Sequence, residues 1–283
     1  MSDPIEGRFA WRKLASAKWE DAWCERLSEV ADRLAITKLA GAKTIRIEAF
    51  ALSSATAERL RKMFGGEVCT QKRPAALTPA ARPPIRVRGK LVVLGSEADR
   101  DAFAAGSSTA VPLLIPAGMA FGTGDHDTTG TCLRLLADVS EEFVPGSWEM
   151  LDLGCGTGIL ALAARLFGAR RVDAGDFDPH AVRTAKANAR TNGISRVAVR
   201  RMDVREWQPE RTWDVVAANL FSGLLVEAAP KLAAVLAKQG RLIFSGVLRE
   251  QEAEVVGAFR RQELRIRRIV RKGKWVAGLA SSN

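Results

Sequence analysis

The chain has 283 residues, a formal net charge of +11 and 47% hydrophobic residues, enough for one large or two ordinary domains with a full core. It contains no long apolar run of the kind that spans a bilayer, and its first residues lack the apolar segment of a signal peptide. The four cysteines are scattered singly, without a Cys-x-x-Cys pair. We therefore expect a cytoplasmic protein with no membrane association, no bound metal and no disulfide framework.

The positive charge lies at the two ends of the chain. Residues 1–90 carry a net charge of +8 and residues 259–283 carry +7, whereas residues 91–258 carry −4. A basic face can bind RNA or a target that associates with RNA. A solvated surface rich in lysine and arginine explains the same charge, so RNA contact through the basic ends is one of two open readings.

Residues 1–95 are predicted to form a small α+β domain. Alternating apolar residues predict a strand over 44–50, and apolar residues at intervals of three and four predict helices over 19–39 and 55–64. Helices interleaved with strands in this way suggest a ferredoxin-like arrangement.

A second domain is expected over residues 111–283, after a linker of small and polar residues at 96–110. From residue 149 strands and helices alternate, and the pattern ends in an antiparallel hairpin over 264–279. Such alternation predicts a doubly wound, mostly parallel sheet that binds its ligand at the carboxyl ends of its strands. The predicted strands are 149–153, 171–175, 197–201, 213–218 and 240–244.

The most informative stretch joins the first of these strands to a helix through a turn with glycine at alternate positions. The turn glycines are Gly154, Gly156 and Gly158, and Asp152 precedes them. Glycine lets the backbone approach a ligand closely, and the free N–H groups of the helix start face the same place. A dinucleotide fingerprint would need a third glycine where Ile159 stands, and a P-loop would need a lysine after the turn. The pattern resembles that of class I S-adenosylmethionine-dependent methyltransferases.

Polar residues follow each of the first four strands of this sheet. Asp176 lies 22 residues after Gly154, near the spacing at which an acid binds a ribose, and Asp203 is placed to accept an adenine amino group. Asp152 needs turn N–H groups or a ligand ammonium to satisfy its charge. Asn219, after the fourth strand, faces the methyl acceptor. A helix cap, a loop acid and a turn residue are the alternative roles of Asp176, Asp203 and Asn219.

A second glycine-spaced loop precedes a helix predicted over 127–139. It reads Ala120-Phe-Gly-Thr-Gly-Asp-His-Asp-Thr-Thr129, and its place just ahead of the sheet suits a cover over the cofactor. Asp125 or Asp127 is expected to cap the helix. His126 is either a proton carrier or a partner in a loop hydrogen bond.

With these segments together, the chain resembles the PrmA-type methyltransferases, which act on ribosomal large-subunit protein eleven. The resemblance covers about residues 111–283 and depends above all on the 120–129 loop. It also depends on Leu151–Ala161, Asp176–Pro179, Asn188, Asn192-Gly193, Val216–Leu220, Ser245–Leu248 and Gly273–Val276.

The resemblance implies that the chain methylates lysine and N-terminal amines of a ribosomal protein, with S-adenosylmethionine as the cofactor. By matched position it implies that Thr128 and Asn219 meet the target amine as catalytic residues. The implied cofactor-binding residues are Phe121, Gly122, Thr123, Gly124, Asp152, Gly154, Gly156, Gly158, Asp176, Asp203 and Asn219. The family's N-terminal domain grips the substrate, and residues 1–95 match it poorly.

Two other classes of function stay open. The first is a methyltransferase that acts on RNA, on another protein or on a small-molecule amine. The Asn-Pro-Pro-Tyr loop that stacks on bases is absent after residue 218, where Asn219-Leu-Phe-Ser222 offers only Phe221. The second is a module that binds the cofactor or a ribosomal partner without catalysis.

Overall fold

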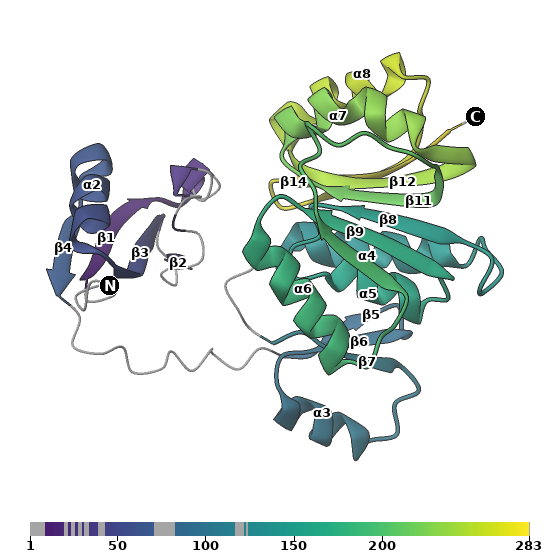
Figure 1. The fold of residues 1–283 in the computed structure, drawn as a ribbon, viewed down its shortest axis with the longest axis horizontal. Helices are drawn as coiled ribbons and strands as arrows, with labels where there is room; N and C mark the ends of the chain where they lie inside the picture. The colour runs from purple at the N-terminus through teal and green to yellow at the C-terminus, as the bar shows by residue number, and fades with distance from the viewer. Residues whose placement is uncertain are drawn as a thin grey trace. The chain divides into compact units, whose positions relative to one another are not determined.

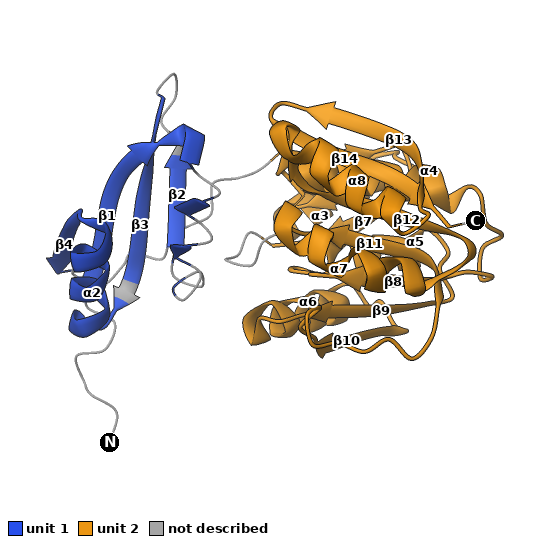
Figure 2. Ribbon diagram, turned by 90° about the horizontal axis from the view of Figure 1, so that it is seen from above, with its two compact units in different colours: residues 1–80 blue, residues 81–283 orange. Residues whose placement is uncertain are grey.

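The computed structural model divides into two compact units, residues 1–80 and residues 81–283 (Figure 2). The strands whose carboxyl ends are predicted to bind a ligand lie in the second unit. The structure describes residues 9–19, 22–23, 26–27, 30, 34–38, 43–70, 83–116, 122 and 124–282.

The first unit is a four-stranded antiparallel sheet with the order β2-β3-β1-β4. Its elements are β1 (Phe9–Ser16), η1 (Ala17–Trp19), β2 (Leu34–Lys38), β3 (Thr44–Leu52), α2 (Ser54–Phe64) and β4 (Glu67–Thr70). Trp11 is fully buried at the centre of this core and donates from Nε1 to the carbonyl of Gly65 at 2.7 Å. The strand order fits the predicted ferredoxin-like arrangement.

The prediction of one helix over residues 19–39 is wrong at its end, because residues 34–38 form β2. Leu34 and Ile36 lie in an antiparallel ladder with β3. The four-residue spacing between Val30 and Leu34 imitates a helical period, although the second of these residues already belongs to the strand. Pairing with β3 therefore overrides a local pattern that fits either element.

The second unit begins with a three-stranded sheet of order β5-β6-β7, formed by β5 (Ile85–Val87), β6 (Leu91–Leu94) and β7 (Val111–Leu114). Asn192 attaches this sheet to the rest of the unit. Its Oδ1 accepts the N–H of Leu114 at 2.8 Å, and its Nδ2 donates to the carbonyl of Leu114 at 2.7 Å. A single amide side chain thus makes both hydrogen bonds of a strand neighbour.

The predicted boundary at residue 95 and the predicted linker over 96–110 differ from the structure. The division lies between residues 80 and 81, and α3 (Glu97–Ala104) occupies half of the expected linker. Ser96 caps α3 by accepting the N–H of Asp99 at 3.1 Å. This helix has no fully buried residue, so it lacks the apolar stripe that identifies a helix from sequence.

The main sheet has seven strands in the order β10-β9-β8-β11-β12-β14-β13 (Figure 1). The first five run parallel, and β14 pairs antiparallel with both β12 and β13. The predicted parallel sheet with a closing antiparallel hairpin is therefore confirmed. The strands are β8 (Glu149–Leu153), β9 (Arg171–Asp176), β10 (Val197–Arg201), β11 (Trp213–Asn219), β12 (Leu236–Leu248), β13 (Arg265–Lys272) and β14 (Trp275–Ser281).

Helices cover both faces of this sheet (Figure 1). One core cluster joins α4 (Asp127–Ser140), α5 (Ile159–Leu166) and α6 (Pro179–Thr191) to one face, and it also contains residues of β5, β6 and β7. A second cluster joins α7 (Ser222–Ala234) and α8 (Glu252–Arg261) to the other face, with η3 (Arg249–Gln251) between β12 and α8. Among the described helices, none combines the length and apolar character that a membrane crossing requires.

Candidate functional site

The carboxyl ends of β8, β9, β10 and β11 lie side by side in the sheet. The register pairs Asp152 with both Ala174 of β9 and Ala217 of β11, and it pairs Arg201 of β10 with Asp176. The polar residues predicted at the strand ends therefore gather at one edge of the sheet.

The glycine turn after β8 has the conformation that its sequence predicts. Gly154, Gly156 and Gly158 have φ values of 70°, 52° and 79°, which favour glycine. The N–H groups of Gly154 and Cys155 donate to the carbonyl of Gly175 at 2.8 and 3.0 Å. Gly158 begins α5, and a Cβ there would lie 2.9 Å from Cβ of Ala185 on α6. The turn is thus held at the sheet edge and against the neighbouring helix.

Asp176 ties the end of β9 to the glycine turn. Its Oδ2 accepts the N–H of Gly156 at 2.9 Å, and its Oδ1 accepts the N–H of Asp178 at 3.0 Å. The helix cap of α6 is Asp178, which accepts the N–H of His180 at 2.8 Å. Burial raises the pKa of Asp176, and these backbone N–H groups oppose that shift. Asp176 therefore lies at the ligand edge predicted for the sheet and braces the glycine turn there, whereas its contact with a ribose stays a prediction.

Asp152 is only 1% exposed, and its two carboxylate oxygens differ in their hydrogen bonding. Its Oδ2 accepts the N–H of Ala161 in the first turn of α5 at 3.1 Å. Its Oδ1 is buried and has no hydrogen-bond partner among the described residues. The pKa of Asp152 is raised to about 7, mainly by burial, with the Ala161 hydrogen bond opposing the shift and the nearby Asp176 adding to it. An oxygen in this state favours a cationic donor, because a positive charge would stabilise the ionised carboxylate.

The described residues Gly122 and Gly124 of the second glycine-spaced loop lie against the glycine turn and the start of α5. Thr157 donates from Oγ1 to the carbonyl of Gly122 at 2.5 Å, and Asn188 of α6 donates to the carbonyl of Thr157 at 2.9 Å. Gly124 approaches Ile159 so closely that a Cβ would lie 3.1 Å from its Cδ1. Phe121 and Thr123, which the sequence also predicts at the cofactor, lie outside the described residues.

The start of α4 brings Thr128 to Asn219. His126, rather than Asp125 or Asp127, is the cap of α4, and its Nδ1 lies 2.7 Å from Thr128 Oγ1 and 3.4 Å from Thr128 N. The backbone N–H can only donate, so Nδ1 of the neutral ring accepts from both groups. Asn219 Nδ2 lies 3.5 Å from Thr128 Oγ1, although 91 residues separate the two. The two predicted catalytic residues are therefore adjacent.

The C-terminal hairpin contacts the start of α4 beside Thr128. The sequence did not predict this contact. The ring of Trp275 packs edge-on against His126 with centroids 5.1 Å apart. Lys272 Nζ lies 2.8 Å from Asp127 Oδ1. The matched motif at 273–276 was the available signal, although nothing in the sequence places it beside α4.

Leu220 is a second residue that sequence reasoning did not identify. It follows Asn219, and its side chain lies where a Cβ on Gly154 would stand. Its N–H donates to the carbonyl of Ser245 at 3.1 Å, and its carbonyl packs against Gly246. The absence of a side chain at Gly154 and Gly246 therefore lets β11, the glycine turn and β12 converge.

Asp203 is half-buried in the loop after β10. Its Oδ1 accepts the N–H of Arg205 at 2.9 Å, and its backbone carbonyl accepts the N–H of Trp207 at 2.8 Å. These bonds fit the loop-acid reading, and the second oxygen of the carboxylate is the one that a ligand amino group would use. Within the described residues, His, Cys, Asp and Glu form no group suited to a metal ion.

Comparison with known proteins places these features in one family. The family model described as ribosomal protein L11 methyltransferase (PrmA) matches residues 78–282. The ribosomal protein L11 methyltransferase of Azotobacter vinelandii is 44% identical over 150 residues, which are 53% of this chain and 50% of that protein. That of Heliobacterium modesticaldum is 39% identical over 167 residues, which are 59% of this chain and 51% of that protein.

The chain thus spans about half the length of the curated relatives it matches. A solved structure of the ribosomal protein L11 methylase from Lactobacillus delbrueckii subsp. bulgaricus is 25% identical, with a TM-score of 0.63. The similarity covers 71% of this chain and 100% of the Lactobacillus chain. The predicted resemblance is confirmed: the chain belongs to the ribosomal protein L11 methyltransferase (PrmA) family.

Proposed function

We propose that the protein transfers methyl groups from S-adenosylmethionine to lysine or N-terminal amines of a ribosomal large-subunit protein. The observation that carries this proposal is the 3.5 Å approach of Asn219 Nδ2 to Thr128 Oγ1 at the edge where the glycine turn lies. These two neutral polar side chains suit an amine that receives a methyl group. Unlike a carboxylate, a neutral hydrogen-bond acceptor does not favour the protonated form of the amine.

The chain offers a site that fits the cofactor. The left-handed glycines Gly154, Gly156 and Gly158 form the turn at the carboxyl end of β8, and the Oδ1 of Asp152, which has no partner among the described residues, suits a cation. We assign the ribose hydroxyls to Asp176 and the adenine amino group to Asp203. The remaining cofactor contacts come from Phe121, Gly122, Thr123, Gly124 and Asn219.

When bound, the cofactor would supply a methyl group already activated on a sulfonium, so the protein must align the acceptor amine in its neutral form. A free lysine has a pKa of about 10.4, so under about 0.1% of it is neutral at pH 7. The Oδ1 carbonyl of Asn219 and the hydroxyl oxygen of Thr128 each accept one hydrogen of the amine and aim its lone pair. His126 prepares Thr128 for this role, because Nδ1 takes the hydroxyl hydrogen and leaves one oxygen lone pair for the amine beside the one that faces Asn219 Nδ2.

The first unit is our candidate for substrate recognition. It is a separate compact body over residues 1–80, and the family model begins only at residue 78. Its sheet is therefore the part of the chain that is free to differ between relatives with different targets. Scattered cysteines and a ribosomal target are consistent with action in the cytoplasm.

RNA is the alternative acceptor, supported by the net charge of +11. Phe221 is 54% exposed directly after Asn219 and is the one aromatic side chain of the 219–222 segment. A base acceptor normally needs stacking from such residues. We favour the amine because Asn219 and Thr128 present hydrogen-bond acceptors rather than a stacking platform.

The test is transfer of labelled methyl groups from S-adenosylmethionine into ribosomal proteins and into a bacterial lysate, with and without ribonuclease. We expect label in protein that survives ribonuclease and disappears with Asn219→Ala. Label that ribonuclease removes would assign the enzyme to RNA. S-adenosylhomocysteine binding without any transfer would leave only a binding module.

A further inference from the structure

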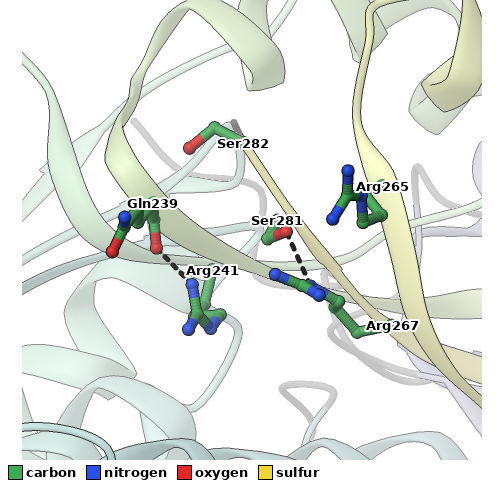
Figure 3. A pocket seen from close by; sticks show the side chains of 6 residues that line it. All are labelled: Gln239, Arg241, Arg265, Arg267, Ser281 and Ser282. Atoms are coloured by element: carbon green, nitrogen blue, oxygen red, sulfur yellow. Dashed lines mark hydrogen bonds between the residues drawn. The ribbon is translucent and has the colours of Figure 1, made fainter.

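A basic pocket lies at the opposite edge of the seven-stranded sheet from the glycine turn. It has a volume of about 380 Å³ and is formed where β12 begins, β13 begins and β14 ends (Figure 3). Its lining residues are Gln239, Arg241, Arg265, Arg267, Ser281 and Ser282. Three arginines and two serine hydroxyls thus line one cavity.

The strand register brings these side chains together. Ser281 of β14 is the partner of Arg241 on β12 and of Arg265 on β13. A bulge in β13 between Ile266 and Arg268 lets Arg267 turn to the same cavity, where its Nε donates to Ser281 Oγ at 3.0 Å. Three adjacent strands therefore place the pocket, and its lining combines the exposed Arg265 and Arg267 with the buried Ser281.

The charges of the pocket are only partly compensated. Arg241, whose side chain is 19% exposed, donates from Nε to Glu142 at 2.8 Å and from Nη1 to the carbonyl of Gln239. Among the described residues, no ion pair joins Arg265 or Arg267 to a carboxylate. The pocket thus keeps two uncompensated guanidinium groups beside one that is already held in place.

The serines fix the floor of the pocket. Ser281 is only 1% exposed. Ser282 donates from Oγ to the carbonyl of Ala237 at 2.7 Å and accepts the N–H of Gly240 at 2.9 Å. Such contacts hold the end of β14 to the start of β12, so the cavity does not have to be ordered by its ligand.

The pocket is separate from the proposed methyl-transfer site. Arg241 precedes Ser245, the register partner of Asn219, by four residues along β12. At about 3.3 Å per residue this separation is about 13 Å. A group bound in the pocket therefore cannot take part in methyl transfer and can act only by anchoring a ligand.

We propose that this pocket binds a phosphate group, such as one phosphate of an RNA chain. Guanidinium groups have a planar fork that matches phosphate oxygens, and hydroxyl groups add neutral donors. A phosphodiester and free phosphate share this chemistry. The function of the pocket does not depend on the identity of the methyl acceptor.

The test compares two variants that lose the same charge. Arg265→Gln with Arg267→Gln removes the uncompensated pocket charges, whereas Arg260→Gln with Arg261→Gln removes two exposed charges at the end of α8, which are not pocket-lining residues. The probes are an oligouridylate of fixed length, inorganic phosphate and a polyglutamate peptide. Arg265→Gln alone serves as a second variant, because this side chain is exposed and its replacement removes a single pocket charge.

We expect the pocket variant to bind oligouridylate about tenfold more weakly than the control variant. The magnitude of the slope of log affinity against log salt should fall by about 0.7 for one lost phosphate contact on a single strand. A selective loss of inorganic phosphate, with oligouridylate binding unchanged, would assign the pocket to free phosphate and support the same chemistry. Equal losses in both double variants, or equal binding of polyglutamate and oligouridylate, would overturn the proposal.

Discussion

The carboxylate of Asp176 accepts the N–H of Gly156 at 2.9 Å, so the end of β9 and the glycine turn after β8 are joined through a side chain. The same carboxylate accepts the N–H of Asp178 at 3.0 Å. A residue predicted from its spacing to a ribose is therefore also a brace of the site. Loss of ligand binding in an Asp176 variant has two separable causes, the missing ribose contact and the relaxed turn.

Asp176→Ala should lower the free energy of unfolding by about 2 kcal/mol, because the buried N–H of Gly156 and the partly buried N–H of Asp178 lose a charged acceptor. It should also abolish the rise in melting temperature that S-adenosylhomocysteine produces. Asp178→Ala is the control, since it removes only the α6 cap and costs about 1 kcal/mol. A ligand-induced rise that persists in Asp176→Ala would remove this residue from the cofactor site.

Asn219→Ala should keep cofactor binding and lower turnover by about a hundredfold, because the acceptor amine loses a positioning contact. Thr128→Val removes the hydroxyl without changing the shape and should act in the same direction, whereas Thr128→Ser should retain activity. Methyl transfer under saturating cofactor and calorimetric binding separate the two effects. Unchanged turnover in Asn219→Ala contradicts its place at the acceptor.

Asp152→Asn should change how stability depends on pH. Burial raises the pKa of Asp152 to about 7, from an unfolded value of about 3.9. Between these values the folded protein keeps a proton that the unfolded chain has released, so wild-type stability falls as pH rises from about 4 to about 7. The variant lacks this loss and should gain most over wild type above pH 7.

Thermal melts at pH 5 and pH 8 without ligand measure this difference. Asn keeps an oxygen for the N–H of Ala161, so the α5 contact is preserved. Asp101→Asn on the exposed side of α3 is the control and should show no such dependence. A melting-temperature difference between Asp152→Asn and wild type that is the same at both pH values would contradict the buried, proton-holding state.

Gly158→Ala tests the packing of the turn on α6. The new Cβ would lie 2.9 Å from Cβ of Ala185, and φ at this residue is 79°. Gly193→Ala is a matched control, because its φ is 63° and nothing lies within 4 Å of the added Cβ. Both variants pay about 1 kcal/mol for the left-handed backbone. Urea unfolding should show a further loss of about 1–3 kcal/mol for Gly158→Ala alone, from overpacking.

The main sheet could be predicted from the sequence, because its strands alternate regularly with helices and its first four strands are followed by a glycine turn or by polar residues. The alternation of elements predicts a mostly parallel sheet, and the glycine turn predicts where the ligand edge lies. The structure confirms this architecture and brings Thr128 beside Asn219 across 91 residues. The assignment of ligand atoms to Asp176, Asp203 and Asp152 stays a prediction.

The sequence did not predict side-chain contacts between segments that are distant along the chain. Leu220 over Gly154 and Trp275 against His126 join segments whose separation along the chain carries no local period. The helix α3 lacks a buried stripe, so a composition of small and polar residues resembled a linker. In each case the information lies in pairing between distant elements rather than in a pattern along one element.

The paired hydrogen bonds between Asn192 and Leu114 have a consequence for association between molecules. β7 is the last strand of its sheet, and an uncovered last strand is a template onto which a strand of another molecule can add. The amide of Asn192 occupies the N–H and the carbonyl of Leu114, the positions that an incoming strand would need. The side chain of Asn192, at the end of α6, thus blocks the edge strand β7 from pairing with a strand of another copy.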